Sequence, residues 1–345
     1  MSGEQPRRSV TLRDVAAAAN VHVATASRAL DPESPHPVSA GTRARVQQVA
    51  ESLGYRSHLV ARGLRRGFSS TVGVVAADLA NPFTAPVLRG LENSLEEAGY
   101  MALVTESRED SALLEKAVNH LLARQVDALV LAAVRAGDRD LVLEWAERVP
   151  VILAVRQLPG SGIPAVTHDD RTGAHLAAEH LAGLGHHHIL EIAGPLDVQT
   201  FSDRHESFVL AARELGLTST TVGPATVPTF EEASQLMAGA LADGPGRATA
   251  VFAHNDFMAM GAVRAIREAG LDCPGDLSVI GYNDVAMAEC LDPPLTTVRL
   301  EGYDMGRLAG TMALEAIGGT SFEGALSQTP ATLVVRASTA PPRAT

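Results

Sequence analysis

Residues 11–30 of the chain read TLRDVAAAANVHVATASRAL, and this stretch predicts two short helices joined by a tight turn. Apolar residues recur at helical spacing in its first half, Asn20-Val21-His22 interrupts the pattern, and a second apolar face begins at Val23. The many alanines suit two helices that cross closely. Asn20 lies where the chain must reverse, and asparagine tolerates the left-handed backbone conformation. The stretch predicts a helix-turn-helix, with an ordinary helical hairpin inside a larger core as the alternative.

A third helix is expected to follow and to close a small core. Ser39 is a suitable N-cap and Gly54 a suitable end for this helix. Its apolar stripe consists of Val46, Val49, Ala50 and Leu53. Residues 55–67, YRSHLVARGLRRG, are too short to fold alone and combine four arginines with leucines. This composition is typical of a segment that becomes ordered on a partner.

Charge is divided unevenly along the chain. Residues 1–68 contain ten arginines and five acidic residues, a formal charge of +5, whereas the whole chain carries -12, which leaves -17 on the remainder. Because DNA attracts a basic surface and repels an acidic one, only the N-terminal region is expected to contact phosphates.

From Thr71 onward, short apolar runs alternate with amphipathic helical stretches, which predicts parallel sheets covered by helices on both faces. The expected buried strands are 72–77, 101–105, 128–133, 151–155, 189–193, 221–222, 250–253 and 278–281. The expected helices are 86–98, 111–124, 138–148, 173–184, 204–215, 231–242 and 258–269.

Ligands of such sheets bind beyond the carboxyl ends of the strands. The residues expected there supply amides, carboxylates, arginines and aromatic rings, a mixture suited to hydroxyl-rich or heterocyclic small molecules. No glycine-rich phosphate loop occurs among them, so no nucleotide cofactor is expected. These segments are 78–83, 106–108, 156–157, 195–204, 255–256 and 282–284.

Several other classes of protein and site are disfavoured. No apolar run reaches the roughly 18 residues that a membrane span needs, and the N-terminus lacks the apolar stretch of a secretory signal, so the cytoplasm is the expected location. Cys273 and Cys290 are expected to be unpaired thiols. The run His186-His187-His188 predicts no metal site, because successive side chains point in alternating directions. Asp169-Asp170 has no accompanying nucleophile and is attributed to a helix N-terminus, so no catalytic residue is expected.

Ten short motifs follow one another in the chain. They are VTLRDVA (10–16), VATASR (23–28), LGYR (53–56), ARGL (61–64), NPF (81–83), GHHHI (185–189), AGP (193–195), HND (254–256), GYND (281–284) and PPLTTV (293–298). In kind and order, from about Val10 to Ser338, they resemble the LacI/GalR (lactose-repressor) family of bacterial transcription regulators.

The resemblance implies an all-α helix-turn-helix headpiece followed by an α/β effector domain of the type I periplasmic-binding-protein-like fold with two subdomains. The implied boundaries are 9–56 for the headpiece, 57–69 for a hinge helix and linker, and 70–339 for the effector and dimerisation domain. Subdomain crossovers are implied near 167, 298 and 328. The proline-rich residues 340–345 are expected to form a disordered tail.

The implied function is that of a repressor that binds a pseudo-palindromic double-stranded operator and responds to a small, sugar-like effector. No heptad segment follows Ser338, which favours a homodimer over a tetramer tied by helices. A cytoplasmic, nucleoid-associated protein with no membrane partner is expected. The alternative is a periplasmic-type solute-binding protein without a regulatory role, which the basic N-terminus and the missing export signal disfavour. An enzyme ranks third.

For DNA, the resemblance implies contacts by Thr11, Val23, Ala24, Thr25, Ser27 and Arg28 in the headpiece and by His58, Ala61 and Leu64 in the hinge. Small apolar side chains at Val23 and Ala24 predict contact with thymine methyl groups. Leu64 is the implied minor-groove wedge. Because Gly63 weakens so short a helix, the hinge is expected to become ordered only when two copies meet on the operator.

For the effector, the resemblance implies contacts by Phe83, Arg204, Phe230, Asn255 and Asn283. Arg204 is expected to fork onto two ligand oxygens, and each aromatic ring is as compatible with core packing as with stacking on a ligand. The chain departs from the family pattern at four positions. These are His22 in place of a Ser N-cap, Val155 in place of an acid, Asp170 in place of Asn, and Asn283 in place of Asp.

Overall fold

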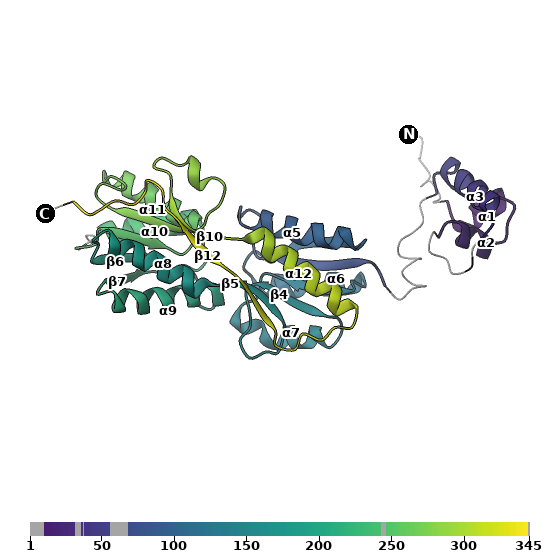
Figure 1. Ribbon diagram of the computed structural model, residues 1–345, viewed down its shortest axis with the longest axis horizontal. Helices are drawn as coiled ribbons and strands as arrows, with labels where there is room; N and C mark the ends of the chain where they lie inside the picture. Colours follow the sequence, from purple (N-terminus) through teal and green to yellow (C-terminus); the bar gives the residue numbers. More distant parts are fainter. Residues whose placement is uncertain (1–9, 32–35, 37, 56–67, 243–245, 344–345) are drawn as a thin grey trace, which may run out of the picture. The chain divides into compact units, whose positions relative to one another are not determined.

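The computed structural model describes residues 10–31, 36, 38–55, 68–242 and 246–343. The chain divides into two compact units, Met1–Ser69 and Ser70–Thr345, and each is treated by itself (Figure 1). We call the described residues of the first unit the headpiece and those of the second unit the body. Within the described ranges, no helix has both the length and the apolar composition to cross a bilayer.

The headpiece consists of the helices α1 (Leu12–Ala18), α2 (Val23–Ala29) and α3 (Ala40–Ser52). Asn20 has a φ of 50° and turns the chain between α1 and α2, which confirms the left-handed turn expected there. Leu53 is 39% exposed and does not belong to the core, because the helix has already ended. The buried core consists of Val15, Ala16, Ala19, Ala26, Ala29, Val46 and Ala50.

Each headpiece helix has a side-chain cap that satisfies backbone N–H groups without a helical partner. Thr11 and Asp14 form a reciprocal capping box at α1. The backbone N–H of Thr42 donates to Ser39 Oγ over 3.3 Å, which confirms Ser39 as the N-cap of α3. At α2, His22 Nδ1 accepts from the backbone N–H of Ala24 over 3.2 Å. The imidazole thus replaces the hydroxyl cap whose loss would cost about 0.5 to 2 kcal/mol.

The body contains two six-stranded sheets. The first has the order β11-β5-β4-β3-β1-β2, and the second β12-β10-β9-β8-β6-β7. The strands are parallel except that β12 runs antiparallel to β10 at the edge of the second sheet. The first sheet comprises β1 (Thr71–Ala76), β2 (Met101–Glu106), β3 (Ala128–Leu131), β4 (Val151–Val155), β5 (Ala165–His168) and β11 (Leu326–Thr329). The second comprises β6 (His188–Ile192), β7 (Thr218–Val222), β8 (Ala250–Ala253), β9 (Ser278–Asn283), β10 (Thr296–Leu300) and β12 (Ala331–Val334).

Helices accompany each sheet and make two subdomains. The first subdomain carries α5 (Thr84–Glu97), α6 (Ser111–Ala123), α7 (Arg139–Ala146) and α12 (Gly302–Ile317). The second carries α8 (Asp170–Gly183), α9 (Gln199–Glu214), α10 (Phe230–Ala242) and α11 (Asp256–Glu268). Helix α12 was not expected from the sequence. It packs along α5, and a Cβ atom at Gly90 or Gly306 would collide with the facing backbone, so glycine permits this close approach (Figure 1).

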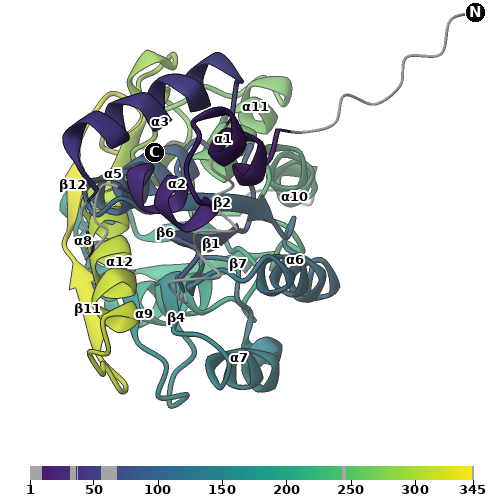
Figure 2. The same cartoon turned by 90° about the vertical axis from the view of Figure 1, so that its right-hand side faces the viewer.

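The chain passes between the sheets three times: between β5 and α8, between β10 and α12, and between β11 and β12. In Figure 2 the last passage is the yellow segment along one edge of the body. The two subdomains are therefore joined by three short connecting segments, an arrangement that permits hinge motion.

Three expectations about the body need correction. Strands β2 and β7 are not buried, because each lies at the edge of its sheet, and Met101 is 53% exposed. The sheets are not wholly parallel, because β12 returns antiparallel to β10. The C-terminal tail is docked as far as residue 343. The backbone N–H of Ala340 donates to Ser278 Oγ, the hydroxyl of Ser278 donates to the backbone oxygen of Ala340, and Arg343 pairs with Asp276. The proline-rich composition did not reveal these partners, which lie about 60 residues earlier.

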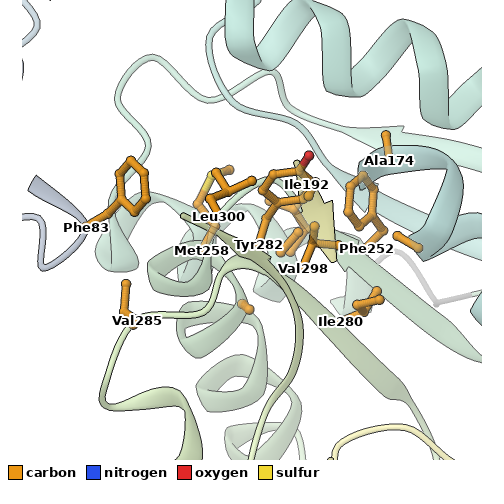
Figure 3. Close-up of a cluster of buried hydrophobic side chains, with 14 of the residues drawn as sticks. Phe83, Ala174, Ile192, Phe252, Met258, Ile280, Tyr282, Val285, Val298 and Leu300 are labelled. Carbon is orange, nitrogen blue, oxygen red and sulfur yellow. The ribbon is translucent and has the colours of Figure 1, made fainter. Parts of the chain in front are cut away.

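Cys273 is buried, Cys290 is exposed and both are free, which confirms the two unpaired thiols. Figure 3 shows part of the main buried cluster, where Phe252, Ile280 and Tyr282 lie close to Val298. These side chains come from β8, β9 and β10, and they form the support on which the second subdomain presents its polar residues.

Candidate effector cleft and DNA-reading helix

A cavity of about 300 Å³ lies between the two subdomains of the body. Most of its polar lining follows the carboxyl ends of strands, where parallel sheets place their ligands. The first subdomain contributes polar and aromatic groups from Asp78, Asn81, Phe83, Arg108, Glu109 and Arg156. The second contributes Thr200, Phe201, Arg204, Asn255, Phe257 and Asn283.

Four of the five residues that the sequence indicated for the effector line this cavity, namely Phe83, Arg204, Asn255 and Asn283. Phe230 does not. As the first residue of α10 it turns its ring toward the exposed Arg264, whose guanidinium carbon lies 5.6 Å from the ring centroid. The cavity is lined instead by Phe201 and Phe257. Phe201 falls within the expected segment 195–204, and Phe257 directly follows the HND motif, so position next to these motifs was the available signal.

Arg204 is held from three sides. Its Nε donates to Asp170 Oδ1 over 2.8 Å, its Nη1 donates to the backbone oxygen of His254 over 2.6 Å, and its guanidinium carbon lies 3.9 Å from the ring centroid of Tyr282. Two of its donor atoms are therefore already used, which corrects the expectation of a fork directed wholly at the ligand. Asp170, the departure from the family's Asn, supplies the neutralising carboxylate. Burial outweighs the charge and the hydrogen bond of Arg204, so the pKa of this carboxyl is raised.

A second buried ion pair lies on the opposite wall. Arg156 donates to both carboxylate oxygens of Glu109, with Nη1–Oε2 at 2.9 Å and Nη2–Oε1 at 2.5 Å. At the rim, Arg108 Nε donates to Glu106 Oε1 over 2.8 Å. Since each of the three cleft arginines faces a carboxylate, the lining suits an uncharged ligand with hydroxyl groups and an apolar face.

Two of the three asparagines that line the cavity, Asn255 and Asn283, stand out by their local structure. Asn255 caps α11 by accepting from the N–H of Met258 over 2.7 Å, and its Nδ2 donates to the oxygen of Pro228 over 3.0 Å. Asn283 ends β9 with a φ of 113° and is 7% exposed. Such a backbone conformation is rare outside glycine and is found mainly at functional positions.

Behind the cavity wall lies a buried acid with three donors. Glu191, fully buried on β6, accepts from His254 Nε2 over 2.9 Å, from His205 Nδ1 over 3.0 Å and from Thr221 Oγ over 3.1 Å. Burial alone would raise the pKa of Glu191, but the two histidines outweigh it and the pKa is lowered. The ring of His254 stacks on Phe201 at 6.1 Å and so supports the cavity wall. This group could not be predicted from the sequence, because Glu191 is a single acidic residue within an apolar strand.

In the headpiece, helix α2 presents residues indicated for DNA. Ala24 is exposed, while Val23 packs partly against the headpiece core. Arg28 Nε donates to the backbone oxygen of Ala24 over 3.1 Å, so its side chain lies along its own helix. Thr11 caps α1, and Thr25 and Ser27 are half-buried on α2. The hinge residues His58, Ala61 and Leu64 lie outside the described residues.

Comparison with known proteins finds matches in both units. Residues 11–58 match the family model for bacterial regulatory proteins, lacI family, and residues 178–339 match that for a periplasmic binding protein-like domain. The chain is 32% identical over 343 residues to the HTH-type transcriptional repressor CytR of Escherichia coli (strain K12), which spans 98% of this chain and 99% of that protein.

Solved structures of transcription regulators are also similar to this chain. The lac repressor dimer bound to operator and the anti-inducer ONPF is similar with a TM-score of 0.86 and 28% identity, over 96% of this chain and 100% of that chain. The transcriptional regulator CelR–cellobiose complex is similar with a TM-score of 0.71 and 27% identity, over 95% of this chain and 99% of that chain.

Proposed function

Since the chain belongs to the LacI family of bacterial regulatory proteins, we propose that it represses transcription by binding a pseudo-palindromic operator as a homodimer. The chain is a DNA-binding transcriptional regulator rather than an enzyme. The observation that carries the proposal is the presence, in one chain, of a capped helix-turn-helix and of a ligand-sized cavity between two subdomains. A solute-binding protein would need only the second.

We assign DNA contacts to Thr11, Val23, Ala24, Thr25, Ser27 and Arg28 and, in the hinge, to His58, Ala61 and Leu64. The charge of +5 on residues 1–68 supports phosphate contacts by this end of the chain alone. We place the headpiece at 9–56 and the hinge at 57–69, and we extend the effector domain, 70–339 by resemblance, to the docked residues up to 343. The protein would act in the cytoplasm, associated with the nucleoid.

We assign the effector to the cleft, with Phe83, Arg204, Asn255 and Asn283 as contacts and with Phe201 and Phe257 in place of Phe230. A sugar or sugar derivative fits the neutralised arginines, the fixed amides and the aromatic rings of the lining. The similarity to a regulator solved with cellobiose supports the same class. Binding would change the relative position of the subdomains and so the free energy of ordering two hinges on DNA.

The proposal is tested by mapping the sites that the full-length protein occupies on its own chromosome and footprinting them with purified protein. A pseudo-palindrome protected by a dimer is expected, and a panel of neutral mono- and disaccharides is then screened for a change in protection. Binding of equal strength to all DNA at physiological salt would contradict the proposal.

The hinge assignment has its own test. Leu64→Ala should reduce specific operator affinity severely and leave the salt-sensitive, non-specific affinity nearly unchanged, because a wedge acts only at its kinked step. Equal loss of both affinities would remove Leu64 from that role.

A further inference from the structure

A bidentate ion pair joins the two subdomains directly across the cleft. Arg135 follows β3 in the first subdomain, and Asp197 precedes α9 in the second. Arg135 Nε donates to Asp197 Oδ2 and Arg135 Nη2 to Asp197 Oδ1, both over 2.8 Å. Such a planar, two-bond contact fixes relative orientation as well as distance.

Two backbone N–H groups donate hydrogen bonds across the cleft beside this pair. The N–H of Ala136 donates to the backbone oxygen of Asp197 over 3.0 Å, and the N–H of Gln157 donates to Gln199 Oε1 over 3.2 Å. Both donors belong to the first subdomain and both acceptors to the second. Their exchange with solvent hydrogen therefore reports whether the subdomains are in contact.

The ion pair continues into the cavity wall. The third guanidinium nitrogen of Arg135, Nη1, donates to the backbone oxygen of Glu109 over 3.1 Å and lies 3.5 Å from its carboxylate. That carboxylate holds Arg156, and both Glu109 and Arg156 line the cavity. A continuous chain of charges runs from the rim to the ligand space.

We propose that Asp197, Arg135, Glu109 and Arg156 form a latch that holds the two subdomains together without ligand and links cleft closure to cleft occupancy. The second part rests on the proposed function of the cleft. A ligand touches both walls of the cavity only when the subdomains are in contact. The latch therefore raises the fraction of protein molecules that can bind the ligand.

The strength of the latch suits reversible opening. The side chain of Arg135 is 16% exposed and that of Asp197 is 55% exposed, so water screens the pair in part. A pair of this kind contributes at most about 1 kcal/mol, which shifts a two-state equilibrium about fivefold. The hydrogen bond from Arg135 also lowers the pKa of Asp197, so the carboxylate stays charged at neutral pH.

The test is hydrogen exchange, followed by mass spectrometry, on the full-length protein without DNA or ligand. Asp197→Ala and Arg135→Ala should each speed exchange at Ala136 and Gln157 about fivefold, and the double variant should be no faster than the single ones. Arg135→Lys keeps the charge but loses the fork, so an intermediate rate is expected.

Arg264→Ala is the matched control, because the ion pair between Arg264 and Glu268 lies within helix α11 of the second subdomain. It should leave both amides at the wild-type rate. Asp197→Ala read at Gln157 is the decisive measurement, since this substitution leaves the Arg135–Glu109–Arg156 contacts next to Gln157 in place. Unchanged exchange at Gln157 in Asp197→Ala and Arg135→Ala, or an equal increase in Arg264→Ala, would overturn the latch. Neither result would bear on the proposed operator binding, which the footprinting experiment tests separately.

Discussion

The contacts that stabilise the headpiece join residues close in sequence, whereas those that stabilise the body join residues far apart in sequence. The headpiece core has seven buried residues, five of them alanine, and its caps join residues two or three positions apart. In the body, the buried pairs Arg204–Asp170 and Arg156–Glu109 join residues 34 and 47 positions apart. The DNA-reading unit therefore depends on close packing of small side chains, and the effector unit depends on long-range polar contacts. Loss of a buried ion pair should therefore destabilise the body, and a change of core volume should destabilise the headpiece.

The largest expected effect is in the body, at Arg204. Arg204→Ala leaves the carboxylate of Asp170, which is 1% exposed, without its partner, and unpairing a buried charge costs about 3 to 5 kcal/mol. The free energy of unfolding of the body, measured by urea denaturation, should fall by this amount. Hydrogen exchange of the headpiece helices should not change.

A second substitution separates charge from packing at this site. Asp170→Asn, which introduces the amide typical of the family, should restore much of the stability of Arg204→Ala, because no uncompensated charge then remains. If Asp170→Asn gives no recovery, the Arg204 side chain acts through its packing on Tyr282 and not through its charge.

The next effect is in the headpiece, at Ala26. This residue is fully buried on α2, and Ala26→Leu adds volume to a core with few side chains that can yield, so a loss of about 1 to 3 kcal/mol is expected. Exchange protection of α1 to α3 should collapse, and operator affinity, measured by fluorescence anisotropy, should fall with it. The urea midpoint of the body should stay the same.

Ala17→Leu is the control for this change, because Ala17 is exposed on α1 and the added side chain meets no core. Equal loss of headpiece protection in both variants would show that local helix propensity, and not core volume, limits this unit.

The same contrast explains what the sequence revealed. The turn at Asn20, the Ser39 cap and the three helices were predictable, because each depends on residues nearby in the chain. In the body the alternation of strands and helices predicted parallel sheets and most of the cleft segments, and the division into two subdomains came from the family resemblance. Phe230 was misplaced, because the direction of a side chain at a helix start depends on the packing of that helix. The partners of Glu191 and of the C-terminal tail were hidden for the same reason.

Stability of the body should also depend on pH through His168. Burial, together with the charge of Arg204, lowers the pKa of His168 from 6.5 to about 3 in the fold. The unfolded chain takes up a proton at this residue below pH 6.5 and the native protein does not, so its contribution is present above pH 6.5 and is lost as the pH falls toward 3. At pH 5.5 this loss amounts to about 1.4 kcal/mol.

The measurement compares the wild type with His168→Asn, which cannot titrate in this range. The difference in free energy of unfolding between the two proteins should shrink by about 1.4 kcal/mol between pH 7.5 and 5.5. His175→Asn, on the exposed side of α8, serves as the control. A difference that stays constant with pH would mean that His168 titrates in the native body with the same pKa as in the unfolded chain.

The smallest effect is at the cap of α2, where the headpiece relies on a contact between neighbours. His22→Ala removes the acceptor of the Ala24 N–H and should destabilise the headpiece by about 0.5 to 1 kcal/mol, read as faster exchange at the first turn of α2. His22→Ser offers a hydroxyl acceptor instead and should match or exceed the wild-type protection. If His22→Ala exchanges at the wild-type rate, water satisfies this N–H as well as the imidazole does. Helix α2 would then be held by the headpiece core and not by its cap, while α1 and α3 keep the caps from Thr11 and Ser39.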